Sequence, residues 1–161
     1  MTDRHPLDDV SRRILAILAH DGRASYQAIA DQVGLSRPAV MERVKRLEEA
    51  GVITGYVAQV DRARVGQPIT AFVAVRYTAS DTVVEEGADR GIRALAAHPY
   101  VLEAHHVAGE DCYMLKVAAP SLQDLESVIR AVRTPGRSVS TRTTIVLSTV
   151  FEKAGVTPVA D

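Results

Sequence analysis

Only two residues, Gly34 and Leu35, separate two segments that each have the apolar periodicity of a helix. Ser25 stands before the first segment, residues 26–33, and Ser36 stands before the second. Serine is a favourable N-cap, and glycine readily adopts the left-handed conformation that ends a helix. The sequence therefore predicts two helices joined by a tight turn.

The helix that starts after Ser36 has two different faces. Its apolar positions Val40, Val44 and Leu47 share one face, and Gly51 marks its end. Pro38 stands in the first turn, where a helix does not need the missing N–H. The basic side chains of this helix are Arg37, Arg43, Lys45 and Arg46. The apolar face predicts packing against a supporting helix. The basic side chains are either part of a solvated face with i to i+4 ion pairs, which charge alone favours, or available for a polyanion.

An earlier helix precedes this pair, because Val10, Ile14 and Ile17 recur at helical spacing, and either Asp8 or Asp9 is available to cap its start. Three short helices with a tight turn before the last one are typical of the helix-turn-helix motif, whose second helix enters the major groove of DNA. A plain three-helix bundle without DNA contact is the alternative interpretation. The residues expected at a DNA interface are Ser25, Tyr26, Ser36, Arg37, Pro38, Met41, Glu42, Lys45 and Arg46. Ser25 and Tyr26 would present a helix N-terminus to a phosphate, while Arg43 lies nearer the core and would equally well pin the helix to its own domain.

The second half of the chain changes to β-type patterns. Residues 52–60 are rich in β-formers, and residues 61–68 are polar with Gly66 and Pro68, so we place a linker there. The later pattern predicts a strand, a helix, two strands, a helix and a last strand, at 69–77, 82–97, 100–107, 112–118, 122–132 and 139–151. This β-α-β-β-α-β order is typical of the ferredoxin-like fold, with both helices on one face of an antiparallel sheet. A second copy of the chain is the economical cover for the other face, which predicts a homodimer.

Composition excludes several classes of protein. The chain has 161 residues, 47% of them hydrophobic, and a formal net charge of -1, which fits a globular protein and not a general nucleic-acid coat protein. It has one cysteine, Cys112, no apolar run long enough for a membrane span and no apolar leader, so we expect a cytoplasmic protein without membrane contact.

Two other functions compete with DNA binding. His98, His105, His106 and Cys112 suggest a metal-responsive regulator, but consecutive residues of a strand face opposite sides, so His105 and His106 would not join one mononuclear site. A small ferredoxin-like enzyme is the other alternative. The sequence contains no phosphate-binding loop and no evident nucleophile with its base, so we expect no catalytic residues, no metal and no cofactor.

The chain resembles the leucine-responsive regulatory protein and AsnC (Lrp/AsnC) family of transcription regulators. The resemblance covers residues 7–151 and is carried by Leu7-Asp8, Arg12-Arg13-Ile14-Leu15, Asp21-Gly22-Arg23-Ala24-Ser25-Tyr26, Val33-Gly34-Leu35-Ser36, Arg46-Leu47-Glu48, Gly51-Val52-Ile53, Val107-Ala108-Gly109-Glu110-Asp111-Cys112-Tyr113 and Thr141–Leu147. It implies an α+β protein with an N-terminal winged helix-turn-helix domain and a ferredoxin-like βαββαβ domain for effector binding and oligomerisation. It also implies dimers formed through the sheets, octamers built from dimers, and an amino acid or similar small effector bound between dimers.

The corresponding division of the chain is residues 1–60 for the DNA-binding domain, 61–68 for the linker, 69–151 for the effector domain and 152–161 for a C-terminal tail. In the family, a Gly-x-x-Asp-Tyr loop holds the effector's amino group, but Cys112 stands at the aspartate position here, and the acid lies one place earlier at Asp111. Either Asp111 substitutes for that aspartate, or the site takes a different ligand, or it takes none.

An effector with a carboxylate and an ammonium group requires N–H donors, an acid and hydroxyl groups. The N–H groups at Gly109 and Glu110 would serve the carboxylate, and Asp111 or Glu110 would serve the ammonium group. The expected effector residues are Tyr100, His106, Gly109, Glu110, Asp111, Cys112, Thr141 and Thr143.

Overall fold

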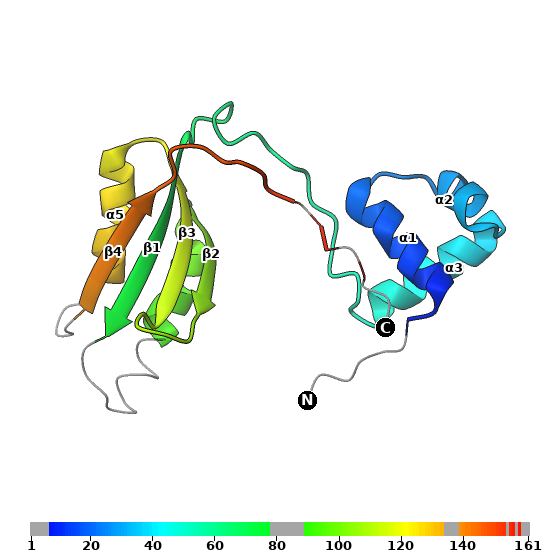
Figure 1. The fold of residues 1–161 in the computed structure, drawn as a ribbon, viewed down its shortest axis with the longest axis horizontal. Coiled ribbons are helices and arrows are strands. Elements are labelled where there is room, and N and C mark those ends of the chain that lie inside the picture. The colour runs from blue at the N-terminus through cyan, green and yellow to red at the C-terminus, as the bar shows by residue number, and fades with distance from the viewer. Residues whose placement is uncertain (1–6, 78–88, 134–138, 154, 157, 159–161) are drawn as a thin grey trace. The chain divides into compact units, whose positions relative to one another are not determined.

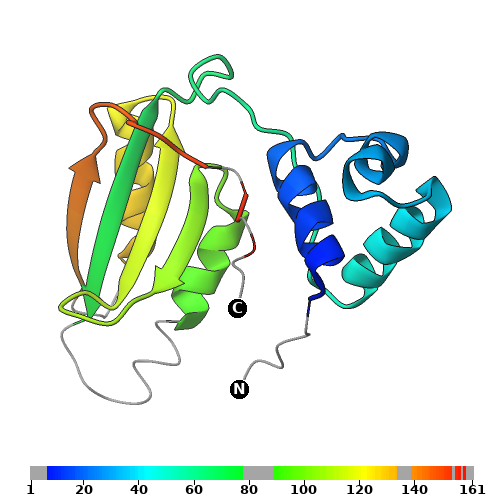
Figure 2. The ribbon, with the colours of Figure 1, turned by 45° about the vertical axis from the view of Figure 1, so that its right-hand side comes forward.

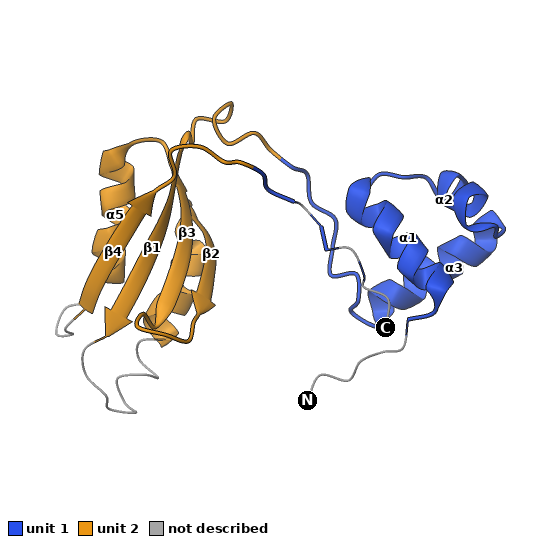
Figure 3. Cartoon of the chain, in the orientation of Figure 1, with its two compact units in different colours: residues 1–59, 151–161 blue, residues 60–150 orange. Residues whose placement is uncertain are grey.

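The computed structural model describes residues 7–77, 89–133, 139–153, 155, 156 and 158. The chain divides into two compact units, residues 1–59 together with 151–161, and residues 60–150 (Figure 3). No helix in the described ranges is long and apolar enough to cross a bilayer.

The first unit contains α1 (Asp9–His20), α2 (Tyr26–Val33) and α3 (Arg37–Glu49) (Figure 1). Each helix begins with a side-chain cap. Asp8, Ser25 and Ser36 accept hydrogen bonds from the backbone N–H three residues later, at 2.7, 3.1 and 3.4 Å. The predicted serine caps are thereby confirmed, and they fix where α2 and α3 start.

The apolar faces of the three helices meet in one core. Its fully buried side chains include Ile14 from α1, Ile29 from α2 and both Val40 and Val44 from α3. Gly34 ends α2 at φ +75°, a conformation that would strain a side-chain-bearing residue. The short turn and the shared core together hold α3 against α2.

The segment after α3 leaves the helix without forming a strand. Residues 52–60 are rich in β-forming residues, but they form no strand in the structure. A strand needs a hydrogen-bonding partner, and Val52 N–H and Ile53 N–H instead donate to the Leu47 carbonyl at the end of α3. The Tyr56 hydroxyl donates to Glu48 at 2.9 Å, and partial burial together with this acceptor raises the pKa of the Tyr56 phenol to about 12.

The second unit is a four-stranded antiparallel sheet with helices. Its elements are β1 (Ile69–Tyr77), a helical stretch over residues 89–94 that continues as η1 (Leu95–Ala97), β2 (Val101–His106), β3 (Tyr113–Ala119), α5 (Leu122–Val132) and β4 (Val139–Ile145). The strand order is β2-β3-β1-β4, with every neighbouring pair antiparallel. The predicted ferredoxin-like plan is confirmed.

Both helical elements pack on one face of the sheet (Figure 2). Ile92 and Leu95 from one, and Leu125 and Val128 from the other, bury the same apolar side of β1 and β3. The opposite face, which we call the open face, carries alternate residues of the strands. The open face includes Phe72, Arg76, Met114, Lys116 and Arg142. Phe72 is 39% exposed in the middle of β1.

Two predicted elements differ in extent. β4 stops at Ile145, not at Phe151, because its partner β1 begins at Ile69 and the last bond between them is from Val146 N–H to the Thr70 carbonyl. Beyond that point the part of the chain that the structure describes provides no partner strand for β4. Of the helix expected over 82–97, residues 82–88 lie outside the described ranges and 89–97 are helical.

Candidate functional site

The outer face of α3 is open to solvent in this chain. Met41 is 50% exposed on it, and the Lys45 and Arg46 side chains extend from the following turn. Each basic group has an acidic neighbour on the same helix, with Lys45 Nζ 3.6 Å from Glu49 and Arg46 Nη2 3.0 Å from Glu42. Such exposed pairs are weak, so both cations remain able to exchange partners for a phosphate or a base.

Arg37 differs from the other basic residues of α3. It is exposed, and in the described part of the chain no carboxylate pairs with it. With Ala24, Ser25, Tyr26 and Gln27 it lines a hollow of about 470 Å³. The N-terminus of α2, which carries partial positive charge, thus lies at the same hollow as a free guanidinium, and both favour an anion there.

Arg43 points the other way. Its Nη1 donates to the Asp8 carboxylate at 2.6 Å and to the Ser11 hydroxyl at 3.3 Å, and its side chain is 30% exposed. The geometry therefore selects the second of the two roles expected for Arg43, which is to fasten α3 to α1.

In the second unit, the turn between β2 and β3 is tied to the rest of the sheet. Val107 N–H donates to the Cys112 carbonyl, and Cys112 N–H donates to the Val75 carbonyl of β1, both at 2.9 Å. The Cys112 thiol is half-buried. These bonds hold the Gly109-Glu110-Asp111 turn at the end of the sheet where Val75 lies.

Two arginines of the open face bind the acids of this turn. Arg76 of β1 donates to the Glu110 carbonyl at 2.6 Å and lies 3.2 Å from the Glu110 carboxylate. Arg142 of β4 lies 2.7 Å from Asp111, whose side chain is 18% exposed. Two carboxylates from the turn and two guanidinium groups from β1 and β4 are therefore clustered at this end of the sheet.

The other expected effector residues lie on the helix-covered face or farther away. The His106 ring stacks on Tyr113 with centroids 4.9 Å apart. His106, Tyr113, Val75 and Thr141 are register partners across the four strands, so all four lie on the helix-covered face. Thr143 lies two positions further along β4, on the same face as Thr141. Arg133 Nη2 donates to the Thr141 hydroxyl at 3.4 Å.

Tyr100 lies just before β2, at the opposite end of that strand from the turn, and its ring packs against His98 at 5.5 Å. The structure does not bring Tyr100 to the turn. His105 and His106 face opposite sides of the sheet as expected, with His105 3.2 Å from Glu103. The hydrogen bond from His105 and the nearby Lys116 ammonium lower the pKa of the Glu103 carboxyl. Within the described ranges no three or more His, Cys, Asp or Glu side chains are grouped as metal ligands.

Comparison with known families covers both units. The family of winged helix-turn-helix DNA-binding domains matches residues 7–54, and the Lrp/AsnC ligand-binding domain matches residues 70–156. The chain belongs to the Lrp/AsnC family of transcriptional regulators.

Individual relatives agree with this membership. The Lrp/AsnC chain is 38% identical over 146 residues to the HTH-type transcriptional regulator LrpA of Mycobacterium tuberculosis strain H37Rv, covering 90% of this chain and 93% of that protein. The crystal structure of LrpA from M. tuberculosis superposes with a TM-score of 0.78 at 36% identity, covering 94% of this chain and all of that one. The transcriptional regulator NMB0573 of Neisseria meningitidis, solved as a complex with L-Met, shares the fold with a TM-score of 0.83 at 22% identity, covering 94% of this chain and 96% of that one.

Some residues of this Lrp/AsnC regulator that take part in these arrangements were not expected from sequence. Gln27 lines the hollow beside Arg37, and its position in the first turn of α2 next to Ser25 is the signal that points to it. Arg76 and Arg142 lie on the open face, and strand alternation alone places them opposite the core. Their pairing with the turn has no signal in the sequence.

Proposed function

We propose that α3 is the recognition helix and lies in the major groove of a DNA duplex. Arg37, Met41 and Lys45 follow one another at four-residue spacing along its outer face, and Pro38, Glu42 and Arg46 lie beside them. Arginine grips guanine with two hydrogen bonds, and a glutamate accepts from the cytosine amino group. Ser36 is exposed at the start of the helix, where it also caps α3.

The hollow at the start of α2 is proposed to hold a backbone phosphate. The backbone N–H groups of the first turn of α2, at Tyr26 and Gln27, would donate to its oxygens, and the Arg37 guanidinium would supply the charge. Such contacts set the register of a protein on DNA, while groove contacts read the sequence.

The accessible outer face of α3, with the apolar positions of the same helix buried beneath it, carries this proposal. We would test it by selecting bound duplexes from a randomised pool and measuring their affinity at several salt concentrations. The double variant Arg37→Ala/Lys45→Ala is expected to bind DNA with an affinity lower by orders of magnitude. The slope of its log affinity against log salt concentration should fall by the equivalent of about two phosphate contacts. Arg130→Ala on α5 is the matched control, since Arg130, like Lys45, is an exposed cation paired with a glutamate on its own helix. Wild-type binding by the double variant would contradict the proposal.

We propose further that the turn at 109–111 binds an amino acid or similar small zwitterion. Arg76 and Arg142 would bind its carboxylate, and Asp111 with Glu110 would bind its ammonium group. The ligand would thereby replace the Arg76–Glu110 and Arg142–Asp111 ion pairs. Asp111 would then fill the role that the family gives to the aspartate at the position of Cys112. His106, Thr141 and Thr143 lie on the other face and would act on this site only through the strands they belong to.

The open face is proposed to pack against a second copy of the chain. It presents Phe72 and Met114 among charged side chains, and nothing in the described parts of this chain covers it. Dimers of this kind would assemble further to octamers in the cytoplasm, where an effector between dimers changes DNA affinity only by binding two assembly or conformational states unequally.

A further inference from the structure

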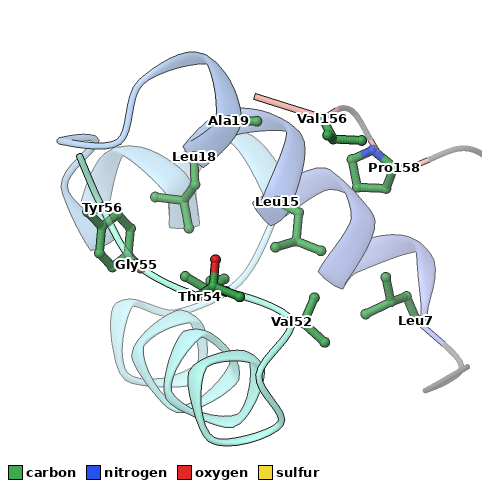
Figure 4. Close-up of a pocket in the computed structure, with 11 residues that line it drawn as sticks. Leu7, Leu15, Leu18, Ala19, Val52, Thr54, Gly55, Tyr56, Val156 and Pro158 are labelled. Atoms are coloured by element: carbon green, nitrogen blue, oxygen red, sulfur yellow. The ribbon is translucent and has the colours of Figure 1, made fainter. Parts of the chain in front are cut away.

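An apolar groove lies on the DNA-binding unit, lined by none of the residues proposed to contact DNA (Figure 4). Its volume is about 410 Å³. One wall comes from α1 through Leu15 and Leu18, and another comes from the segment after α3 through Val52 and Tyr56. A groove lined by large apolar side chains is a place where a further piece of protein gains free energy by docking.

Two described residues of the C-terminal part of the same chain also line this groove. Val156 and Pro158 line it on the side of α1, although almost the whole sheet unit separates them from α1 in sequence (Figure 4). Pro158 is half-buried, whereas Val156 is 87% exposed and contributes little apolar contact.

Gly155 shows how closely the two segments approach. A Cβ at this position would stand 2.8 Å from the Ala19 carbonyl oxygen and 2.9 Å from the Ala19 Cβ. Both distances are shorter than any ordinary contact, and one of the two partners is helix backbone that has no freedom to move aside. The backbone at Gly155 therefore rests directly on the last turn of α1, and only glycine fits there.

We infer that Gly155, Val156 and Pro158 form a docking segment that fastens the C-terminal end of the chain to α1 of the DNA-binding unit. The chain passes from α3 into the sheet unit through residues 52–68 and returns after β4 to this segment. The DNA-binding unit thus has two chain connections to the sheet unit.

A disulfide trap tests which chain supplies the segment. The trap combines Ala19→Cys and Gly155→Cys in a Cys112→Ser background, which removes the natural cysteine. The Cβ atoms of the two introduced cysteines need to move apart by only about 1 Å to reach disulfide geometry. We expect both thiols to disappear on oxidation while the chain still runs as a monomer on a denaturing gel without reductant. A covalent dimer would show that the segment of a second copy occupies the groove. Two free thiols would show that the docking segment does not bind in the groove. Either result overturns the inference. Ala19→Cys with Ala131→Cys on α5 is the control for random oxidation.

Hydrogen exchange of the full-length chain provides a second test that does not depend on cysteine. Gly155→Val pushes a branched side chain into Ala19 and is expected to speed amide exchange severalfold in the last turn of α1 and in residues 52–56. Val150→Ser, which alters a side chain that is 91% exposed and lies outside the docking segment, is the matched control and should exchange as the wild type does. Equal exchange in Gly155→Val and wild type would overturn the inference. Neither test involves DNA, so its failure is distinguishable from a failure of the proposed DNA binding.

Discussion

One carboxylate, that of Asp8, caps the start of α1 and holds Arg43 in the middle of α3. Its Oδ1 accepts from Ser11 N–H at 2.7 Å, and its Oδ2 accepts from Arg43 Nη1 at 2.6 Å. The same group therefore stabilises a helix and sets the position of the proposed recognition helix relative to its support. The hydrogen bonds from Ser11 and then Arg43 lower the pKa of the Asp8 carboxyl from 3.8 to about 2.

The stability of the DNA-binding unit is expected to depend on this carboxylate at acid pH. Because the pKa in the folded state is lower than in the unfolded state, Asp8 stabilises the fold fully above about pH 4 and loses that effect as the pH falls toward about 2. Asp8→Ala should lower the free energy of unfolding by about 1 kcal/mol at neutral pH, mainly through the lost cap. Asp8→Asn keeps a capping side chain and should cost less, since the ion pair that it loses is partly exposed to solvent. Chemical denaturation of all three proteins between pH 2 and pH 7 measures both effects.

Arg43 itself should behave unlike the other basic residues of α3. Arg43→Ala removes a contact within the domain, so we expect a small loss of stability and no change in the salt dependence of DNA binding. Lys45→Ala should instead flatten that dependence by about one phosphate contact. If Arg43→Ala flattened it equally, Arg43 would be a DNA contact and its bond to Asp8 would be incidental.

The features that sequence predicts correctly are local. Ser25 and Ser36 act as caps three residues from their donors, and the period of Val40, Val44 and Leu47 places one face of α3 in the core. The features that it missed depend on distant partners. β4 ends where β1 runs out, and residues 52–60 lack a partner strand. Asp111 and Arg142 are 31 residues apart and meet only because of the strand order. Composition and spacing contain no information about such pairings.

The cluster at the turn leads to a prediction about ligands. In a thermal-shift screen of the standard amino acids, we expect at least one to raise the melting temperature, because a ligand that binds only the folded state stabilises it by mass action. Asp111→Asn should abolish that shift by removing the negative charge that would face the ammonium group. Asp89→Asn, which removes a carboxylate paired with Arg93 on a helix of the same unit, should leave it intact. A flat response of the wild type to every amino acid would exclude an amino-acid effector.

The open face leads to a prediction about assembly. Phe72 lies in the centre of that face, so Phe72→Lys would bury a charge in the proposed dimer and should shift the protein toward monomers in sedimentation velocity. Leu122→Lys changes an equally apolar and more exposed residue at the start of α5, on the helix side of the sheet, and should leave the assembly unchanged. Dissociation by the second variant and not by the first would place the dimer interface on the helices.

Glu42 gives the most discriminating test of base reading, because it is an acid on the proposed DNA-contacting face. Its carboxylate lies 3.0 Å from Arg46, and in a complex it would repel the nearest phosphates unless it accepts from a base. Glu42→Gln removes the repulsion and weakens the acceptor. We therefore expect severalfold tighter binding to a scrambled duplex and a smaller preference for the selected one, measured by fluorescence anisotropy at fixed salt. Glu126→Gln on α5, a carboxylate paired with Arg130 in the same way, should alter neither affinity. Equal strengthening toward both duplexes would mean that Glu42 affects DNA only through its charge and that other residues on the outer face of α3 read the sequence.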